Sequence, residues 1–287
     1  MGRTFIKVIH LCPTMTELLS YPNADSLNVK LLDGSEHDWE SLIEMMDDDN
    51  YYYGYLGKVA LSSSIIKTIL KSPKEYLKYL NNVGEEDSQP LRDGKLFHWR
   101  ILEPHKFDAL HVVDVSSKNT KAFKEAVAEF GSSVFTKGEI ENALVLADVM
   151  MRNEEIADYL EGAHFEVPQI QVIDGIPIRG KADILKGNEI IDLKTTADLS
   201  SFAYSARKFG YDLQAYLYLQ LFPECEKFTF ICIDKKTHDL GIYECSQEFL
   251  ESGKEKLERG LATFKKFFVN AEDTEETLAQ LVFRGTL

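Results

Sequence analysis

The chain has 287 residues, of which 44% are hydrophobic and 28% charged, a composition typical of a soluble globular protein with one large or two modest domains. Its net charge of −15 argues against DNA binding over the whole surface, because phosphate contacts need basic side chains. No run approaches the roughly 18 apolar residues of a membrane span, and the N-terminus lacks the apolar core of a signal peptide. We therefore expect a cytoplasmic protein without a membrane partner.

The first 55 residues show no clear periodicity. We expect a strand over residues 5–11 and a short helix over 14–20, followed by an acidic stretch and a tyrosine-rich run at 51–55. Such tyrosines could stack on bases, but anchoring a linker is the favoured interpretation. The predicted organisation is an N-terminal extension of unknown role (1–55) and a functional domain (56–287).

Helical signals become regular from residue 62. Ser63 can cap a helix that continues through Leu70, and Ser72-Pro73 begins another, with proline at the first helical position. Apolar residues at helical spacing predict further helices over residues 91–102, 120–129, 137–152 and 154–160.

Strands are expected in the second half of the chain. They cover residues 164–171, 177–185 and 189–195, the last two joined by a tight turn. A helix over 200–221 then precedes strands at 228–234 and 240–245 and a last helix from 247 to about 269. This order predicts an α/β (α+β) fold, a central mixed β-sheet flanked by helices.

Two aspartates and a lysine lie on the two middle strands of this pattern. Asp183 and Asp192 fall on neighbouring strands, and Asp192 and Lys194 share one face while Ile191 and Leu193 point to an apolar face. Buried charges are costly unless they are paired or bind a metal, and carboxylate oxygens suit Mg²⁺ or Mn²⁺. The alternative is a surface salt bridge between Asp192 and Lys194.

The spacing Asp183-x8-Asp192-x-Lys194, followed by Thr195-Thr196, resembles the core of the PD-(D/E)xK nucleases. Within that superfamily it resembles the branch that contains RecE (exonuclease VIII) and the RecB-type nuclease domains. The resemblance implies that Asp183, Asp192 and the Leu193 backbone carbonyl bind one or two metal ions. It also implies that Lys194 positions or deprotonates the attacking water.

The helix after the catalytic strands carries a second motif. At 100° per residue, Arg207, Tyr211, Gln214 and Tyr218 fall on one stripe. Gln214-x-x-x-Tyr218 resembles the Q-x-x-x-Y motif of the RecB-type family, which implies that Gln214 orients the lysine or a phosphate and that Tyr218 supports it. An ordinary amphipathic helix with a satisfied polar edge is the alternative.

A histidine lies upstream on the helix over residues 91–102. Gly94-x-x-x-His98, followed by Leu102-Glu103-Pro104, resembles the G-x-x-x-H…L-E-P helix of the RecE-like family, although Lys95 replaces a residue that is commonly small there. The resemblance implies that His98 is a metal ligand, whereas an inward-facing histidine is otherwise most often structural.

A further acidic ligand is expected on the strand before the first catalytic aspartate. Glu166 is the best match, and Glu161 and Glu189 are weaker alternatives. The candidates for contacts with DNA phosphates are Arg179, Lys181, Thr195, Thr196, Arg207 and Lys208.

The function that this resemblance implies is a Mg²⁺-dependent exodeoxyribonuclease, with Mn²⁺ able to substitute. It would degrade one strand of linear double-stranded DNA from 5′ to 3′ and leave 3′ overhangs for a RecT-like single-strand annealing protein. The setting would be recombination in a bacterial cell or a phage-infected host, with a ring-shaped homo-oligomer around the DNA. An endonuclease, a helicase-coupled nuclease and a catalytically inactive DNA-binding or assembly module are the alternatives.

The distribution of the four cysteines is the reason for considering the helicase-coupled alternative. Fe–S relatives of these nucleases carry one early and three late cysteines, as Cys12, Cys225, Cys232 and Cys245 superficially do. The C-x6-C-x12-C spacing of the late three is not a compact clip, so buried free thiols in a reducing compartment are the favoured interpretation.

Overall fold

The structure, a computed structural model, describes residues 28–81 and 88–282. The strand and helix expected at 5–11 and 14–20, and Cys12, lie outside the described residues.

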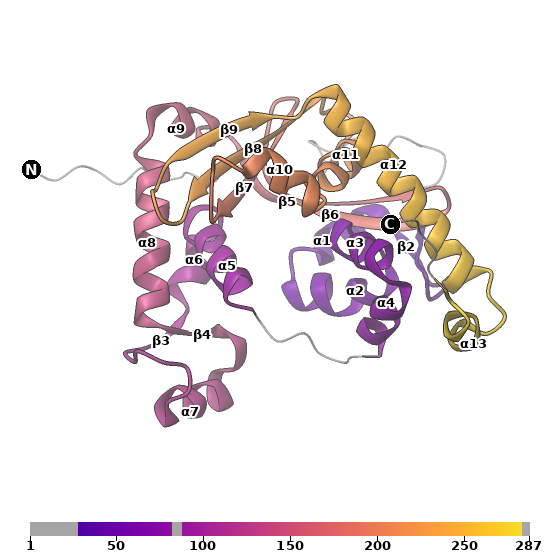
Figure 1. Ribbon diagram of the computed structural model, residues 1–287, viewed down its shortest axis with the longest axis horizontal. Helices are drawn as coiled ribbons and strands as arrows, with labels where there is room; N and C mark the ends of the chain where they lie inside the picture. Colours follow the sequence, from indigo (N-terminus) through magenta and orange to yellow (C-terminus); the bar gives the residue numbers. More distant parts are fainter. Residues whose placement is uncertain (1–27, 82–87, 283–287) are drawn as a thin grey trace, which may run out of the picture.

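A five-stranded mixed sheet in the order β5-β6-β7-β8-β9 forms the centre of the molecule (Figure 1). Strands β5 (His164–Ile173), β6 (Ile176–Lys186) and β7 (Glu189–Thr196) form an antiparallel meander. Strand β8 (Lys227–Asp234) runs parallel to β7, and β9 (Leu240–Glu244) is antiparallel to β8. The expected α+β fold with a central mixed sheet is confirmed.

Two helices connect β7 to β8, where the sequence predicts one. Helix α10 (Phe202–Lys208) ends before Gly210, and α11 (Tyr211–Leu221) begins after it. Gly210 has φ +68°, a left-handed conformation that glycine adopts readily and that interrupts helical geometry. The prediction of a single continuous helix over residues 200–221 is therefore wrong.

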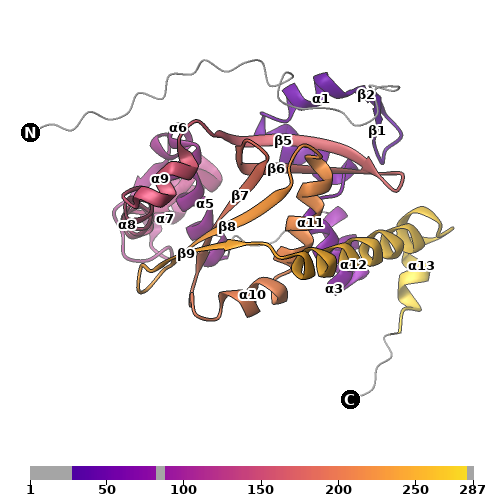
Figure 2. The same ribbon diagram turned by 90° about the horizontal axis from the view of Figure 1, so that it is seen from above.

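Helices cover both faces of the sheet (Figure 2). Helices α5 (Gln89–Leu102), α8 (Lys137–Met151) and α9 (Glu154–Leu160) pack against one apolar cluster, which includes Ile191 and Leu193 of β7. Both side chains are fully buried, which confirms the apolar face expected for them. The other cluster is formed with α11, α12 (Gln247–Phe264) and α3 (Ser63–Lys71).

The N-terminal described residues pack on this second cluster. A hairpin of β1 (Asn28–Lys30) and β2 (Glu36–Asp38) leads into α1 (Trp39–Met45), the π-helical segment η2 (Asn50–Tyr55) and α2 (Leu56–Val59). All of these elements except β2 contribute buried side chains to the core they share with the sheet. The functional boundary at residue 55 stays a prediction.

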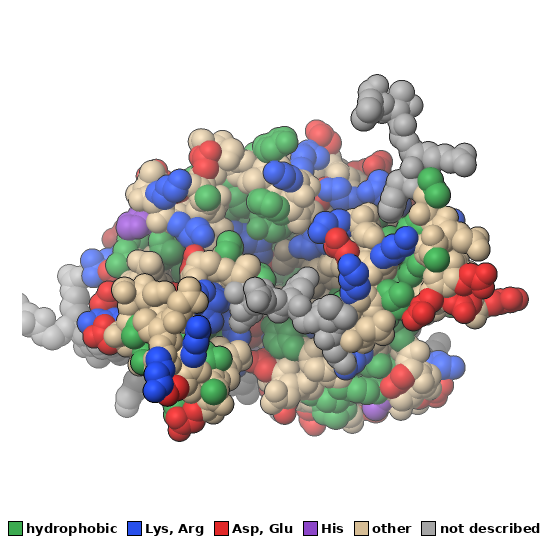
Figure 3. All heavy atoms as spheres, turned by 60° about the horizontal axis from the view of Figure 1, so that its bottom comes forward, with side chains coloured by type: hydrophobic (Ala, Val, Ile, Leu, Met, Phe, Trp, Pro, Cys, Tyr) green, Lys and Arg blue, Asp and Glu red, His purple; other side chains and the backbone are tan. Residues whose placement is uncertain are grey.

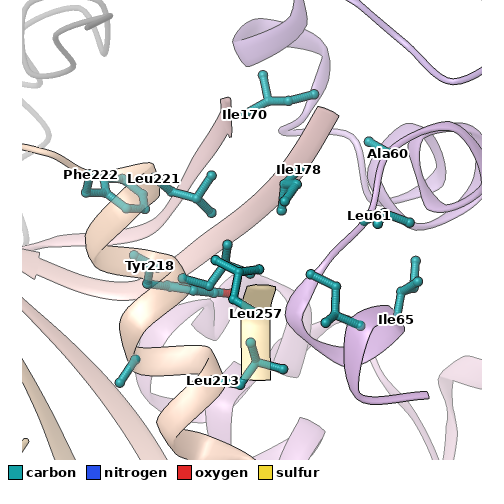
Figure 4. Packing of buried hydrophobic residues seen from close by; sticks show 14 of the residues in the cluster. Ala60, Leu61, Ile65, Ile170, Ile178, Leu213, Tyr218, Leu221, Phe222 and Leu257 are labelled. Carbon is teal, nitrogen blue, oxygen red and sulfur yellow. The ribbon is translucent and has the colours of Figure 1, made fainter. Parts of the chain in front are cut away.

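Helix α3 is anchored to the sheet at its first turn. Leu61 bridges to Ile178 of β6 in parallel, and Figure 4 shows Leu61 and Ile65 on one side of Ile178 with Tyr218 and Leu221 of α11 on the other. The α3 cap is Ser62 rather than Ser63, because the Ser62 hydroxyl accepts the Ile65 N–H at 3.4 Å.

The remaining elements lie outside the five-stranded sheet. They are α4 (Pro73–Leu80), α6 (Pro104–Asp108), β3 (His111–Val113), α7 (Lys121–Phe130), η3 (Gly131–Ser133), β4 (Val134–Thr136), η4 (Lys265–Val269) and α13 (Thr274–Ala279). Within the described ranges, no helix combines the length and the apolar sequence needed to cross a membrane.

Candidate active site

Backbone pairing between the strands is interrupted where the acidic residues lie. Strands β6 and β7 pair over only three residue pairs next to their turn. Beyond these pairs the Asp183 carboxylate, rather than a β6 carbonyl, accepts the Leu193 N–H at 2.9 Å. Pairing between β5 and β6 is also interrupted once, at Glu166, whose φ of +51° is uncommon for a residue with a side chain. The register places Glu166 opposite Asp183, and Asp183 opposite Asp192.

Three potential ligands converge at this opening. His98 of α5, Glu166 of β5 and Asp183 of β6 each offer one ligand atom, and these atoms lie within 4.8 Å of one another. The His98 Nε2–H donates to the Leu193 carbonyl at 2.8 Å, which leaves Nδ1 at 3.4 Å from Asp183 Oδ2. The structure thus brings together His98, Asp183 and the Leu193 carbonyl as the sequence pattern proposes. It adds Glu166, which the sequence offered as the less certain ligand.

Asp192 and Lys194 form a buried pair beside this cluster. Lys194 Nζ lies 2.5 Å from Asp192 Oδ2, and Gln214 Nε2 of α11 donates to Asp192 Oδ1 at 2.5 Å. The Asp192 and Lys194 side chains are only 3% and 17% exposed, so the pair is not a surface salt bridge. The Lys194 ammonium also lies 5.0 Å from the centre of the Tyr211 ring.

Tyr218 fixes the helix that carries Gln214. Its buried hydroxyl accepts the Lys181 N–H at 3.4 Å and donates to the Lys181 carbonyl at 3.2 Å. Close packing of α11 on β6 is possible because Gly180 has no side chain: a Cβ there would lie 2.6 Å from Leu221. Tyr218 therefore acts through the position of α11, one turn away from Gln214.

Burial and neighbouring charges shift the ionisation of the carboxylates and the lysine of the site. Burial, reinforced by the charge of Asp183, raises the pKa of Glu166 to about 9. Burial likewise raises the pKa of Asp192 to about 6, although Lys194 opposes the shift. Burial alone would lower the pKa of Lys194, but the charges of Asp192 and Asp183 outweigh it and raise that pKa.

This donor set fits a hard divalent cation. Two carboxylates and an imidazole nitrogen meet at the cluster, and a bound cation would stabilise the ionised forms that burial disfavours. Mg²⁺ and Mn²⁺ accept such oxygen-rich ligands. His98, Glu166 and Asp183 would hold the ion, with Asp192 adjacent.

The site opens into a cleft of about 1580 Å³, bounded on one side by α5 and α6 and on the other by η2, α3 and α4. Among the described residues, eight Lys and Arg and five Asp and Glu side chains line it, so the cleft is positive within a chain of charge −15. Figure 3 shows Lys and Arg side chains around the hollowed middle of this face. The basic residues are thus gathered where an anionic polymer would lie.

The six candidates for phosphate contacts divide into two groups. Arg179, Lys181, Thr195 and Thr196 line the cleft. Arg207 and Lys208 do not: they are at the end of α10, where Arg207 pairs with Glu248 at 3.0 Å. The helix break at Gly210 is the physical reason, because it removes Arg207 from the stripe that carries Gln214 and Tyr218.

The weaker acidic alternatives lie elsewhere. Glu189 is at the other end of β7 and accepts a hydrogen bond from Thr229 at 2.5 Å, and Glu161 is exposed just after α9. The thiols of Cys225, Cys232 and Cys245 are free, and burial raises the pKa of all three.

Five lysines that line the cleft were not among the candidates from the sequence, and two of them, Lys67 and Lys106, make contacts near the site. Lys67 of α3 lies 5.8 Å from the centre of the Tyr211 ring, and burial together with the charge of Lys194 lowers its pKa to about 8. Lys106 bridges Asp49 and Glu103 at 2.6 and 2.7 Å. A lysine on a short amphipathic helix carries no sequence signal that separates a cleft position from a solvated one.

A family model described as "PDDEXK-like domain of unknown function (DUF3799)" matches residues 62–277. The chain belongs to this family. The match covers the five-stranded sheet and both aspartates, and it confirms the PD-(D/E)xK assignment made from the Asp183 and Asp192 motif.

One solved structure agrees with the fold of this PDDEXK-like chain. A crystal structure described as a "putative exonuclease" from Eubacterium rectale aligns with a TM-score of 0.60 at 19% identity, over 84% of this chain and 95% of that one. A second structure, SSO0001, aligns with a TM-score of 0.29 at 16% identity, over 68% of this chain and 85% of that one. No curated protein matches. Family and fold together support a nuclease.

Proposed function

We propose that the chain is a Mg²⁺-dependent exodeoxyribonuclease of the RecE type that degrades linear double-stranded DNA from 5′ to 3′ and leaves 3′ overhangs. One observation carries the proposal: the cluster of His98, Glu166 and Asp183 adjoins the buried Asp192–Lys194 pair within a basic cleft. That combination offers a cation site, a fixed ammonium and room for a phosphodiester.

Each residue of the site has its own role in the proposed reaction. A divalent ion held by His98, Glu166 and Asp183 would supply Lewis-acid stabilisation of the phosphate and a lower pKa for the attacking water. Lys194 is held as an ammonium by Asp192, so its proposed role is to donate hydrogen bonds to the phosphate or the water rather than to accept a proton. Gln214 fixes the Asp192 carboxylate for this task.

The wider role is part of the proposal. The 3′ overhangs would be taken up by a RecT-like annealing protein in the cytoplasm of a bacterial or phage-infected cell. A ring-shaped homo-oligomer would enclose the duplex, with the basic cleft turned inward and the acidic surface outward. Light scattering tests the ring: a trimer or tetramer is expected, and a strict monomer would contradict it.

The activity is tested with end-labelled linear duplex and covalently closed circles of the same sequence, in Mg²⁺ and in Mn²⁺. Nucleotides should be released from the linear duplex alone, with the 5′ label lost first. Cutting of closed circles would make the protein an endonuclease. DNA binding without any release in either metal would leave an inactive binding module.

A further inference from the structure

Arg179 is a buried cation that pairs with no carboxylate of the described residues. Its residue is 4% exposed, and among residues 28–81 and 88–282 it forms no ion pair. Its Nε is buried without a hydrogen-bond partner. Its guanidinium instead lies against Tyr52, whose ring centre is 4.1 Å away and whose side chain also hydrogen-bonds to it, and Tyr52 carries no carboxylate.

A second buried arginine, Arg92, has its charge and its hydrogen-bond donors satisfied by neighbouring groups. Arg92 is 7% exposed, and its guanidinium donates to both Glu139 carboxylate oxygens at 2.7 and 3.1 Å and to the Val134 carbonyl at 2.9 Å. Burial of a guanidinium without such partners is costly. The carboxylate of Asp49, which also lines the cleft, already pairs with Lys106 at 2.6 Å and with Lys181 at 3.7 Å.

The first turn of α3 lies beside Arg179. The Arg179 N–H donates to the Leu61 carbonyl at 2.8 Å, and Leu61 directly precedes the cap residue Ser62. Ser62 and Ser63 line the same cleft as Arg179. The Ile65 N–H of this nine-residue helix is capped by Ser62, whereas the N–H groups of Ser63 and Ser64 have no partner within the helix, and such groups bind anions.

We propose that Arg179 and the first turn of α3 bind one phosphate group of the nucleic acid other than the scissile one. A planar guanidinium, hydroxyls and helix N–H groups are the donors that phosphate oxygens accept. Arg179 and Asp183 are four residues apart on one strand, which separates this phosphate from the metal cluster by about 13 Å. The proposal rests on the proposed function for its ligand, and it sets the register of the DNA in the cleft.

The test measures binding without cleavage. Fluorescence anisotropy in EDTA compares the wild type, Arg179→Gln and Arg179→Lys over a series of salt concentrations. Arg152→Gln is the matched control, because Arg152 is an exposed arginine at the C-terminal cap of α8, outside the cleft. Arg179→Gln should weaken binding about tenfold or more. It should also reduce the slope of log K against log salt by roughly 0.7–0.9, the loss of one phosphate contact.

The duplexes distinguish the source of the phosphate. They carry a 5′-phosphate, a 5′-hydroxyl, or a single uncharged methylphosphonate at successive positions from the end. If Arg179 binds the terminal phosphate, wild type and Arg179→Gln should have the same affinity for the 5′-hydroxyl duplex. If Arg179 binds a backbone phosphate, the two affinities should become equal when the methylphosphonate is at that one position.

An unchanged affinity and salt slope for Arg179→Gln would overturn the proposal. A loss of equal size on every modified duplex would do so too, because it would show a structural role. If Arg179→Gln does not fold, Arg179→Lys takes its place in the same comparison: its loss of affinity relative to the wild type should disappear at one modified position, and an equal loss on every duplex would overturn the proposal. Because no divalent ion is present, this result is independent of whether the wild type releases nucleotides.

Discussion

Gln214 donates a hydrogen bond to Asp192 Oδ1 across 2.5 Å, from a helix to the strand that carries the catalytic pair. The other oxygen of the same carboxylate faces Lys194. Gln214 therefore sets the rotation of the carboxylate about its terminal bond and, through it, the direction of the ammonium. Its role is positional, and it differs from that of the residues around the metal cluster.

Gln214→Ala should lower kcat by about 10- to 100-fold, as loss of a residue that orients a ligand does, with a smaller change in KM. The measurement is nucleotide release from linear duplex in Mg²⁺. Gln220→Ala is the control, because Gln220 is exposed on the same helix. An equal effect of both substitutions would show that helix stability, rather than the hydrogen bond to Asp192, is responsible.

Lys194→Ala should reduce kcat by about 10²–10³-fold, because it removes a preorganised charge from beside the phosphate. Metal affinity, measured by calorimetry, should change little. Since the pKa of Lys194 is raised, activity should not require loss of a proton from this lysine near neutral pH. Lys227→Ala, at an exposed lysine of β8, should retain activity. Full activity of Lys194→Ala would contradict the assignment.

The metal-free protein should become less stable as pH rises. The pKa of Glu166 is raised from 4.5 to about 9 and that of Asp192 from 3.8 to about 6, both chiefly by burial. A raised folded-state pKa contributes stability that is complete below the unfolded value and is lost as pH rises through the folded one. In EDTA, Tm should therefore fall between pH about 4 and about 9, and Mg²⁺ should restore it.

Glu166→Gln provides the matched comparison. It should raise the Tm of the metal-free protein at pH 8, flatten most of the pH dependence and abolish stabilisation by Mg²⁺. Glu258→Gln, at an exposed position on α12, should do none of these. If the Tm of Glu166→Gln fell with pH as steeply as that of the wild type, a buried group other than Glu166 would be responsible for the pH dependence.

Tyr218→Phe tests the support of α11. It removes both hydrogen bonds to the Lys181 backbone, so the free energy of unfolding should fall by about 1 kcal/mol in urea titrations. Activity should fall less than in Gln214→Ala, because Tyr218 touches neither Asp192 nor Lys194. A loss of activity greater than that of Lys194→Ala would show that Tyr218 contacts the substrate.

Local patterns in the sequence were enough to predict the strands of the sheet and the neighbouring positions of Asp183 and Asp192, because alternation and turn signals are local. The break at Gly210 was not predictable, since one glycine in an apolar periodic run is compatible with a continuous helix. Arg207 was consequently assigned to the wrong stripe. The isolation of Arg179 and the approach of Lys67 depend on segments more than a hundred residues apart, which periodicity does not report.

Leu193 has three attachments at once. Its N–H is held by Asp183, its carbonyl by His98, and its side chain is locked in the apolar layer beneath the sheet. A methyl group gained or lost deep in that layer would therefore displace the very peptide from which the site takes its geometry. Core substitutions that lie far from any DNA would therefore reduce activity before they lower the melting temperature.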